Sequence, residues 1–137
     1  MQVKWTQDLS VDVKEIDAQH KELLRRISGL DSAMKQGRAR EEIFPLLEFL
    51  EEYAVIHFRT EEVYMIKYRY PRYQLHKAKH EWFAEEFAAI RKGLEKEGAT
   101  PEVIVRSNNL LITWFCSHIR TTDAALGAFL KPKIVKL

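Results

Sequence analysis

Two pairs of polar residues stand four positions apart in segments that are otherwise rich in apolar residues. His57 and Glu61 form the first pair, and His76 and His80 form the second. Because a helix advances about 100° per residue, the members of each pair share one face of a helix. That face also carries the apolar residues, so the sequence predicts imidazole and carboxylate groups in a buried interior.

The other histidines follow the same pattern, so all five histidines of the chain are predicted to point inward. His20 lies one helical turn before Leu23, and His118 lies on the inner face of the last apolar segment. A single histidine on an apolar face is usually a core residue with one hydrogen bond. Burying five imidazoles together with the carboxylates of Glu61 and Asp123 would cost several kcal/mol for each unpartnered group. A common partner is therefore required.

A metal site would satisfy these groups together. Imidazole nitrogens and carboxylate oxygens bind iron, zinc, manganese and copper, and all four metals are admissible here. Seven ligands are too many for one ion, so two ions bridged by carboxylates fit best. The segment from His76 to His80 lacks the glutamate of the HExxH motif of zinc proteases. The histidine-rich set also differs from the carboxylate-bridged oxidases of the ferritin-like group, which use mainly glutamates.

The spacing of His118 and Asp123 makes a specific structural demand. Residues five apart are separated by roughly 140° on a regular helix. For Asp123 to face the same metal ions as His118, the helix must widen between them. We therefore predict a π-like turn or a kink between Ser117 and Ala124.

The elements that position these residues are four segments with helical periodicity, which predict an all-α, up-down-up-down four-helix bundle. Asp17 is the expected N-cap of the first segment, and Thr100 is the expected N-cap of the fourth. The inward stripes are expected to include Phe44, Leu75 and Val105. The four segments are residues 17–35, 40–67, 72–97 and 101–131, with Gly37 ending the first and Pro132 ending the last.

Residues 1–16 lack this period and are predicted to form an extended N-terminal arm. Residues 17–131 would form the bundle and residues 132–137 a tail, which makes residues 1–137 a single domain. Asp17 and Glu62 are expected on solvated helix faces. The alternative for both is that they orient a histidine ligand from behind.

Composition excludes several classes of function. The net charge is +2, and the 46% hydrophobic and 31% charged residues are typical of a soluble globular protein. Basic and acidic residues are interleaved, so no nucleic-acid surface is indicated. No apolar run approaches the length of a membrane span, and the N-terminus lacks the apolar region of a signal peptide. The single cysteine, Cys116, excludes an internal disulfide and a cysteine-built zinc site. These features together favour the cytoplasm.

The motifs taken together resemble those of the bacterial hemerythrins, a family of dioxygen-binding di-iron proteins. The matching pieces occur in the family's order and at its spacings, and they cover nearly the whole chain. One departure is Asp12, which stands where relatives commonly carry glycine and puts the conformation of the arm in doubt. The matching pieces are Trp5, IDAQH ending at His20, HFRTEE from His57, Tyr70–Pro71, HKAKH from His76 and HIRTTD from His118 to Asp123.

The resemblance implies a cofactor of two iron ions, bridged by an oxo or hydroxo group and by the carboxylates of Glu61 and Asp123. One iron would be bound by three histidines and the other by two, which leaves an open position for dioxygen on the second iron. By the same resemblance, the three histidines are His76, His80 and His118, and the two are His20 and His57.

Apolar residues next to the expected ligands would keep the dioxygen position dry, because water hastens irreversible oxidation of the iron pair. Ordinary core packing also explains each of these residues, and a side chain can do both. We expect the walls of the pocket to be Leu23, Phe58, Trp114, Ile119 and Leu126.

The first functional hypothesis is therefore a non-catalytic protein that binds dioxygen reversibly, for transport, storage or supply. Three alternatives stay open: a sensor of dioxygen, redox state or nitric oxide that acts through a separate partner, a di-iron peroxidase-type enzyme, and a metal-free helical interaction module. An enzyme would need proton donors near the open iron, which the apolar pocket does not offer. The cost of burying the polar set argues against the metal-free module.

Overall fold

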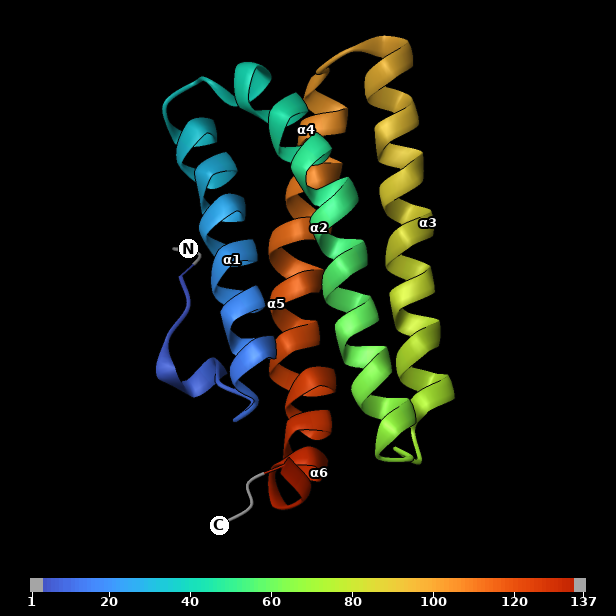
Figure 1. The fold of residues 1–137 in the computed structure, drawn as a ribbon. Helices are drawn as coiled ribbons and strands as arrows, with labels where there is room; N and C mark the ends of the chain where they lie inside the picture. The colour runs from blue at the N-terminus through green and yellow to red at the C-terminus, as the bar shows by residue number, and fades with distance from the viewer. Residues whose placement is uncertain (1–3, 135–137) are drawn as a thin grey trace.

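A computed structural model describes residues 4–134 of the chain, and its helices form a four-helix bundle (Figure 1). The described residues contain no strand, so the predicted all-α class is confirmed. The first three helices are α1 (Lys14–Lys35), α2 (Ala39–Lys67) and α3 (Tyr73–Glu97). The fourth rod consists of α4 (Pro101–Asn108), α5 (Phe115–His118) and α6 (Ala124–Ile134), joined by the π-helical turns η2 (Asn109–Trp114) and η3 (Ile119–Asp123).

Successive rods run in opposite directions, as Figure 1 shows from blue α1 through green α2 and yellow α3 to the orange and red fourth rod. Short connections reverse the chain each time, which is the up-down-up-down arrangement that the four periodic segments predicted. The arm in front of α1 contains one 3₁₀ turn, η1 (Gln7–Leu9).

Two of the predicted helix ends are confirmed. The Oγ1 of Thr100 accepts a hydrogen bond from the backbone N–H of Val103 at 3.2 Å, with Pro101 at the first helical position. Gly37 follows the end of α1 with a φ of +71°, a left-handed conformation that glycine adopts without a steric penalty.

The predicted role of Asp17 as an N-cap is wrong, because α1 already begins at Lys14. The carboxylate of Asp17 instead accepts hydrogen bonds from the Ser10 hydroxyl at 2.5 Å and from the Val11 N–H at 2.8 Å. Asp12 between them has a φ of +60°. Asp17 therefore fixes the bend of the arm, and it neither caps the helix nor orients a histidine.

The arm packs closely on the C-terminal part of the bundle. Val11 and Val13 are buried in one apolar cluster with Leu126 and Leu130 of α6. A side chain at Gly127 would overlap the backbone of Val11, so the closeness of this contact depends on a glycine in α6.

Two further details of the prediction are wrong. Pro132 does not end the last helix, since α6 continues through Ile134. Proline has a helical φ and lacks only one backbone donor, so α6 passes through it. Phe44, Leu75 and Val105 are 44%, 58% and 53% exposed, although the inward stripes were expected to include them. Each lies beside the buried stripe of its helix, where a single apolar residue on the surface is ordinary.

The buried apolar residues form two separate clusters. The larger cluster includes Leu24, Ile43 and Phe87. The smaller cluster includes Ile16 and Leu130 and packs the arm against the end of the bundle that contains α6. Among residues 4–134, none of the helices combines the length and the apolar character that crossing a bilayer would require. The division into one domain, with an arm and a tail, stays a prediction.

Candidate metal centre

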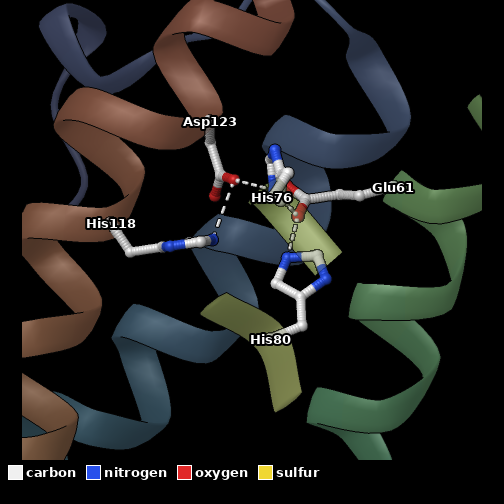
Figure 2. Close-up of side chains that lie close together, drawn as sticks. All are labelled: Glu61, His76, His80, His118 and Asp123. Carbon is white, nitrogen blue, oxygen red and sulfur yellow. Dashed lines mark hydrogen bonds and ion pairs between the residues drawn. The ribbon is translucent and has the colours of Figure 1, made fainter. Parts of the chain in front are cut away.

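All four rods contribute to one buried polar cluster, which contains all seven residues singled out from the sequence. Every one of them is at most 3% exposed. Figure 2 shows five of the seven side chains pointing toward one another from α2, α3 and the fourth rod. The contributing residues are His20 on α1, His57 and Glu61 on α2, His76 and His80 on α3, His118 on α5 and Asp123 at the end of η3.

The Glu61 carboxylate stands between the histidines of different helices. Its Oε1 atom lies 3.0 Å from His80 Nε2 and 3.3 Å from His76 Nε2. Its Oε2 atom faces the other way and lies 3.5 Å from His57 Nε2 and 3.7 Å from His20 Nε2. One carboxylate thus offers one oxygen to each of two groups of histidines.

Asp123 divides its oxygens in the same manner. Its Oδ1 atom lies 3.1 Å from the Nε2 atoms of both His76 and His118, and its Oδ2 atom lies 3.0 Å from His20 Nε2. We call His76, His80 and His118 the three-histidine half of the cluster, and His20 and His57 the two-histidine half. Each half has both carboxylates within reach, and the donor atoms within each group lie within 4.8 Å of one another.

The π-helical turn η3 brings Asp123 into this arrangement, as predicted from its spacing to His118. The turn spans Ile119–Asp123 and lies between Ser117 and Ala124. A π turn inserts the extra residue that rotates Asp123 back toward the cluster. A second π turn, η2 (Asn109–Trp114), precedes α5 and was not predicted, because no pair of polar residues across it signals a change of helical phase.

The cluster leaves several buried polar atoms without a hydrogen-bond partner, and such atoms are costly to bury. Because these nitrogens and oxygens face one another, a cation between them would satisfy many at once. Imidazole and carboxylate donors are suited to iron, and they also accept other divalent transition metals. The unpartnered atoms include Nε2 of His20, His57, His80 and His118, Oε2 of Glu61 and both carboxylate oxygens of Asp123. The residues therefore fit a pair of metal ions.

The electrostatic surroundings give the histidines of the cluster different pKa values. Burial lowers the pKa of His20 and of His76, but the nearby negative carboxylates of Asp123 and Glu61 outweigh burial and raise each pKa to about 9. Burial dominates for His57 and lowers its pKa to about 4. Burial also disfavours the charged carboxylates of Glu61 and Asp123, yet the surrounding imidazoles hold both pKa values below their ordinary range.

Two polar side chains contact the Nδ1 atoms of histidine rings, on the side of each ring that faces away from the centre of the cluster. The Oε1 atom of Gln19 lies 2.8 Å from His57 Nδ1, and the Gln19 amide donates a hydrogen bond to the Thr60 hydroxyl at 3.0 Å. Glu62 Oε2 lies 3.0 Å from His80 Nδ1. Glu62 therefore takes the orienting role that was the alternative to a solvated face. Gln19 was missed, although its place between Ile16 and Leu23 at the edge of the apolar stripe was a usable signal.

Two of the five predicted pocket residues stack on histidine rings of the cluster, and the pocket itself stays a prediction. The Phe58 ring stacks on His80 with ring centroids 4.0 Å apart, and Trp114 stacks on His118 at 4.7 Å. Leu23 and Ile119 are fully buried in the larger apolar cluster, whereas Leu126 belongs to the smaller one. The polar cluster therefore has apolar packing on two sides.

A further aromatic residue beside the two-histidine half was not predicted as part of the pocket. The ring centroid of Phe115 lies 6.4 Å from that of His20 and 6.3 Å from that of His57. Phe115 is 1% exposed. Its spacing to His118 gave no signal that it would lie beside His20 and His57.

Comparison with known proteins identifies the family. A family model described as the hemerythrin HHE cation binding domain matches residues 11–130. A bacteriohemerythrin of Pseudomonas aeruginosa is 32% identical over 120 residues, which cover 88% of this chain and 76% of that protein.

Two other bacteriohemerythrins extend the likeness to distant bacteria. The protein of Methylococcus capsulatus is 30% identical over 124 residues, covering 90% of this chain and 92% of its own. That of Aquifex aeolicus is 30% identical over 112 residues, covering 80% and 82%. With the matched family model spanning nearly the whole bundle around a buried histidine and carboxylate cluster, the chain belongs to the hemerythrin family.

Proposed function

We propose that this chain binds dioxygen reversibly at a non-haem di-iron centre and serves in its transport, storage or supply. The proposed bridges between the two irons are the carboxylates of Glu61 and Asp123, with an oxo or hydroxo group as the third. The proposed terminal ligands are His76, His80 and His118 on one iron and His20 and His57 on the other.

The unequal number of donors in the two halves carries this proposal. Five residues surround one candidate ion position, namely three histidines and both carboxylates, and four surround the other. With the same bridges on both sides, an ion held by the two-histidine half would have one terminal ligand fewer than an ion in the other half. A position left open by the protein is what a small ligand such as dioxygen requires.

When bound, a pair of ferrous ions supplies the electrons and the free coordination position that dioxygen binding needs. The chain contributes the enclosure. Phe115 lies beside both rings of the two-histidine half, and Leu23 and Ile119 are completely buried. Apolar walls limit the access of water and anions, which supports reversible binding over irreversible oxidation.

The chain also fixes the orientation and charge of the donors. Gln19 holds the Nδ1 atom of His57, and Glu62 holds that of His80, so each ring presents Nε2 to the centre. The two carboxylates supply two negative charges beside five neutral imidazoles. They offset only part of the charge of two ferrous ions, and the remaining positive charge favours an anionic third bridge.

The decisive experiment is anaerobic reconstitution with ferrous iron, followed by metal analysis and optical spectroscopy during cycles of air and inert gas. The proposal expects about two irons per chain and an absorption band that appears in air and disappears when dioxygen is removed. Rapid conversion to an inert diferric form, with hydrogen peroxide consumed on each addition, would overturn it in favour of the peroxidase-type alternative.

A further inference from the structure

An aromatic stack connects the three-histidine half with the protein surface. The ring of His118 lies against that of Trp114, with centroids 4.7 Å apart and planes inclined by 18°. Trp114 in turn contacts Trp82 of α3, with centroids 5.7 Å apart and planes inclined by 33°. Trp82 is 46% exposed. Two indole rings therefore lie in succession between a candidate iron ligand and an exposed side chain.

The unpredicted π turn is part of this arrangement. Trp114 is the last residue of η2, and His118 follows one helical turn later, so the two rings lie on the same face of the fourth rod. Phe83 of α3 packs against the Trp114 ring at 5.0 Å and holds it in place. Both tryptophans line a surface pocket of about 220 Å³, through which a small molecule can reach the indole rings.

We propose that Trp82 and Trp114 form an electron relay that would carry electrons, one at a time, from a reductant in solution through His118 to the metal pair after hydrogen peroxide has oxidised it. The relay rests on the proposed di-iron function, because a redox-active pair must be present at its inner end. Electron tunnelling weakens steeply with distance, and indole is among the most easily oxidised side chains. Two indole rings in close contact therefore divide one long transfer into short ones.

The transfer balances as follows in atoms and charge. With a peroxide-oxidised metal pair bound, Trp114 would lose one electron to it through His118 and become an indole radical cation, which an electron from Trp82 would restore. The Trp82 radical cation releases its Nε1 proton to water and then takes a hydrogen atom from a reductant such as ascorbate. The metal pair gains one electron, the reductant loses one electron and one proton, and both tryptophans are regenerated.

The relay would protect the site. Hydrogen peroxide acting on the iron pair produces an oxidant that attacks the nearest oxidisable groups, which include the imidazole rings themselves. With the relay, the oxidising equivalent moves outward to Trp82, where a reductant can quench it. Without a reductant, oxidation should accumulate on Trp82, far from the buried donors.

The test is to treat the iron-loaded protein with hydrogen peroxide in the absence of reductant and to map oxidised residues by tandem mass spectrometry. Trp5 is the internal control, since the sequence has three tryptophans and the indole of Trp5 packs beside Lys21 on α1, apart from the stack. We expect severalfold more oxidation of Trp82 than of Trp5. Because Trp82 is more exposed than Trp5, metal-free protein sets the baseline ratio of their oxidation. Iron loading should raise this ratio severalfold, and added ascorbate should return it to the baseline.

Two variants separate the members of the relay. Trp114→Phe should reduce the oxidation of Trp82 to the level of metal-free protein and shift it to peptides that contain His80 and His118. Trp82→Phe changes a half-exposed residue, so it keeps the test valid if the Trp114 variant does not fold. In that variant oxidation should accumulate on Trp114, and a freeze-quenched tryptophan radical should persist longer in ascorbate.

Iron content and the reversible optical band are measured before peroxide is added, which separates the two proposals. A chain that binds no iron overturns both of them. A chain that binds two irons but oxidises Trp82 no more than Trp5, or oxidises Trp82 equally in the Trp114→Phe variant, overturns the relay and leaves dioxygen binding intact.

Discussion

The two halves of the buried cluster share their carboxylates but differ in what lies behind their histidines. In the three-histidine half, His80 faces the charged Glu62, and stacked aromatic rings cover His80 and His118. In the two-histidine half, His57 faces the neutral amide of Gln19. A carboxylate partner makes an imidazole a stronger donor than an amide does. In the proposed di-iron centre, this difference would favour firm metal binding in the three-histidine half and an accessible metal in the two-histidine half.

The largest effect should come from removing a carboxylate that both halves share. We expect Glu61→Ala to lose both metals, because its two oxygens face opposite groups of histidines. The measurement is the iron content per chain after reconstitution and desalting. Glu52→Ala on the exposed face of α2 is the matched control and should retain full loading. If Glu61→Ala still bound two irons, the bridging role would be refuted.

Removing one terminal histidine should instead distinguish the halves. His57→Ala leaves three donors in the two-histidine half, whereas His118→Ala leaves four in the other. We therefore expect His57→Ala to retain about one tightly bound iron and to lose the dioxygen band, while His118→Ala retains part of its second iron. Metal titration of the two variants side by side gives the measurement. Equal losses would mean that the two halves do not differ in the number of their ligands.

Helical periodicity was sufficient to predict the buried cluster, whereas its division into two halves was implied by the family resemblance. The spacing of four, together with the apolar residues on the same face, assigned both pairs on α2 and α3 to the interior. The spacing of five between His118 and Asp123 required the π turn η3. The turn η2 had no such polar pair and could not be predicted. Asp17 was misassigned because its carboxylate accepts hydrogen bonds from Ser10 and Val11 in the bend of the arm. Rules for helix capping do not include such a contact.

The hydrogen bonds behind the histidines show where sequence reasoning ends. Glu62 follows Glu61 on α2, and periodicity places it about 100° away from the cluster, on a partly solvated face. Its side chain nevertheless reaches His80 on α3. Contacts of this kind depend on the distance between two helices and on a rotamer, and neither can be read from a periodic pattern.

The pH dependence of metal binding should sharpen the comparison further. His20 and His76 have pKa values raised to about 9 and must lose their protons before they can bind a metal. Affinity should therefore rise from pH 7 to pH 9, by up to roughly tenfold per pH unit for each histidine, and should level off above that range. Titration with cobalt(II) as a redox-inactive probe measures this trend.

Each half contains one of these two histidines, so both metals should respond to pH to a similar degree. His57, whose pKa is lowered to about 4, is already neutral at pH 7 and should add nothing to the trend. An affinity that did not change with pH between 7 and 9 would contradict the protonation of His20 and His76 in the metal-free chain.

The smallest effects should come from the groups behind the rings. We expect Gln19→Leu and Glu62→Gln each to weaken metal affinity by roughly 10- to 100-fold, because each change removes or weakens a hydrogen bond that orients a histidine. Gln19→Leu should act on the two-histidine half through His57, and Glu62→Gln on the other half through His80. Competition with a chelator of known affinity resolves the two binding steps. Glu62→Gln keeps the shape of the side chain and removes its charge. Unchanged metal affinity in this variant would show that hydrogen bonding alone orients His80. It would also show that the charge of Glu62 does not distinguish the two halves.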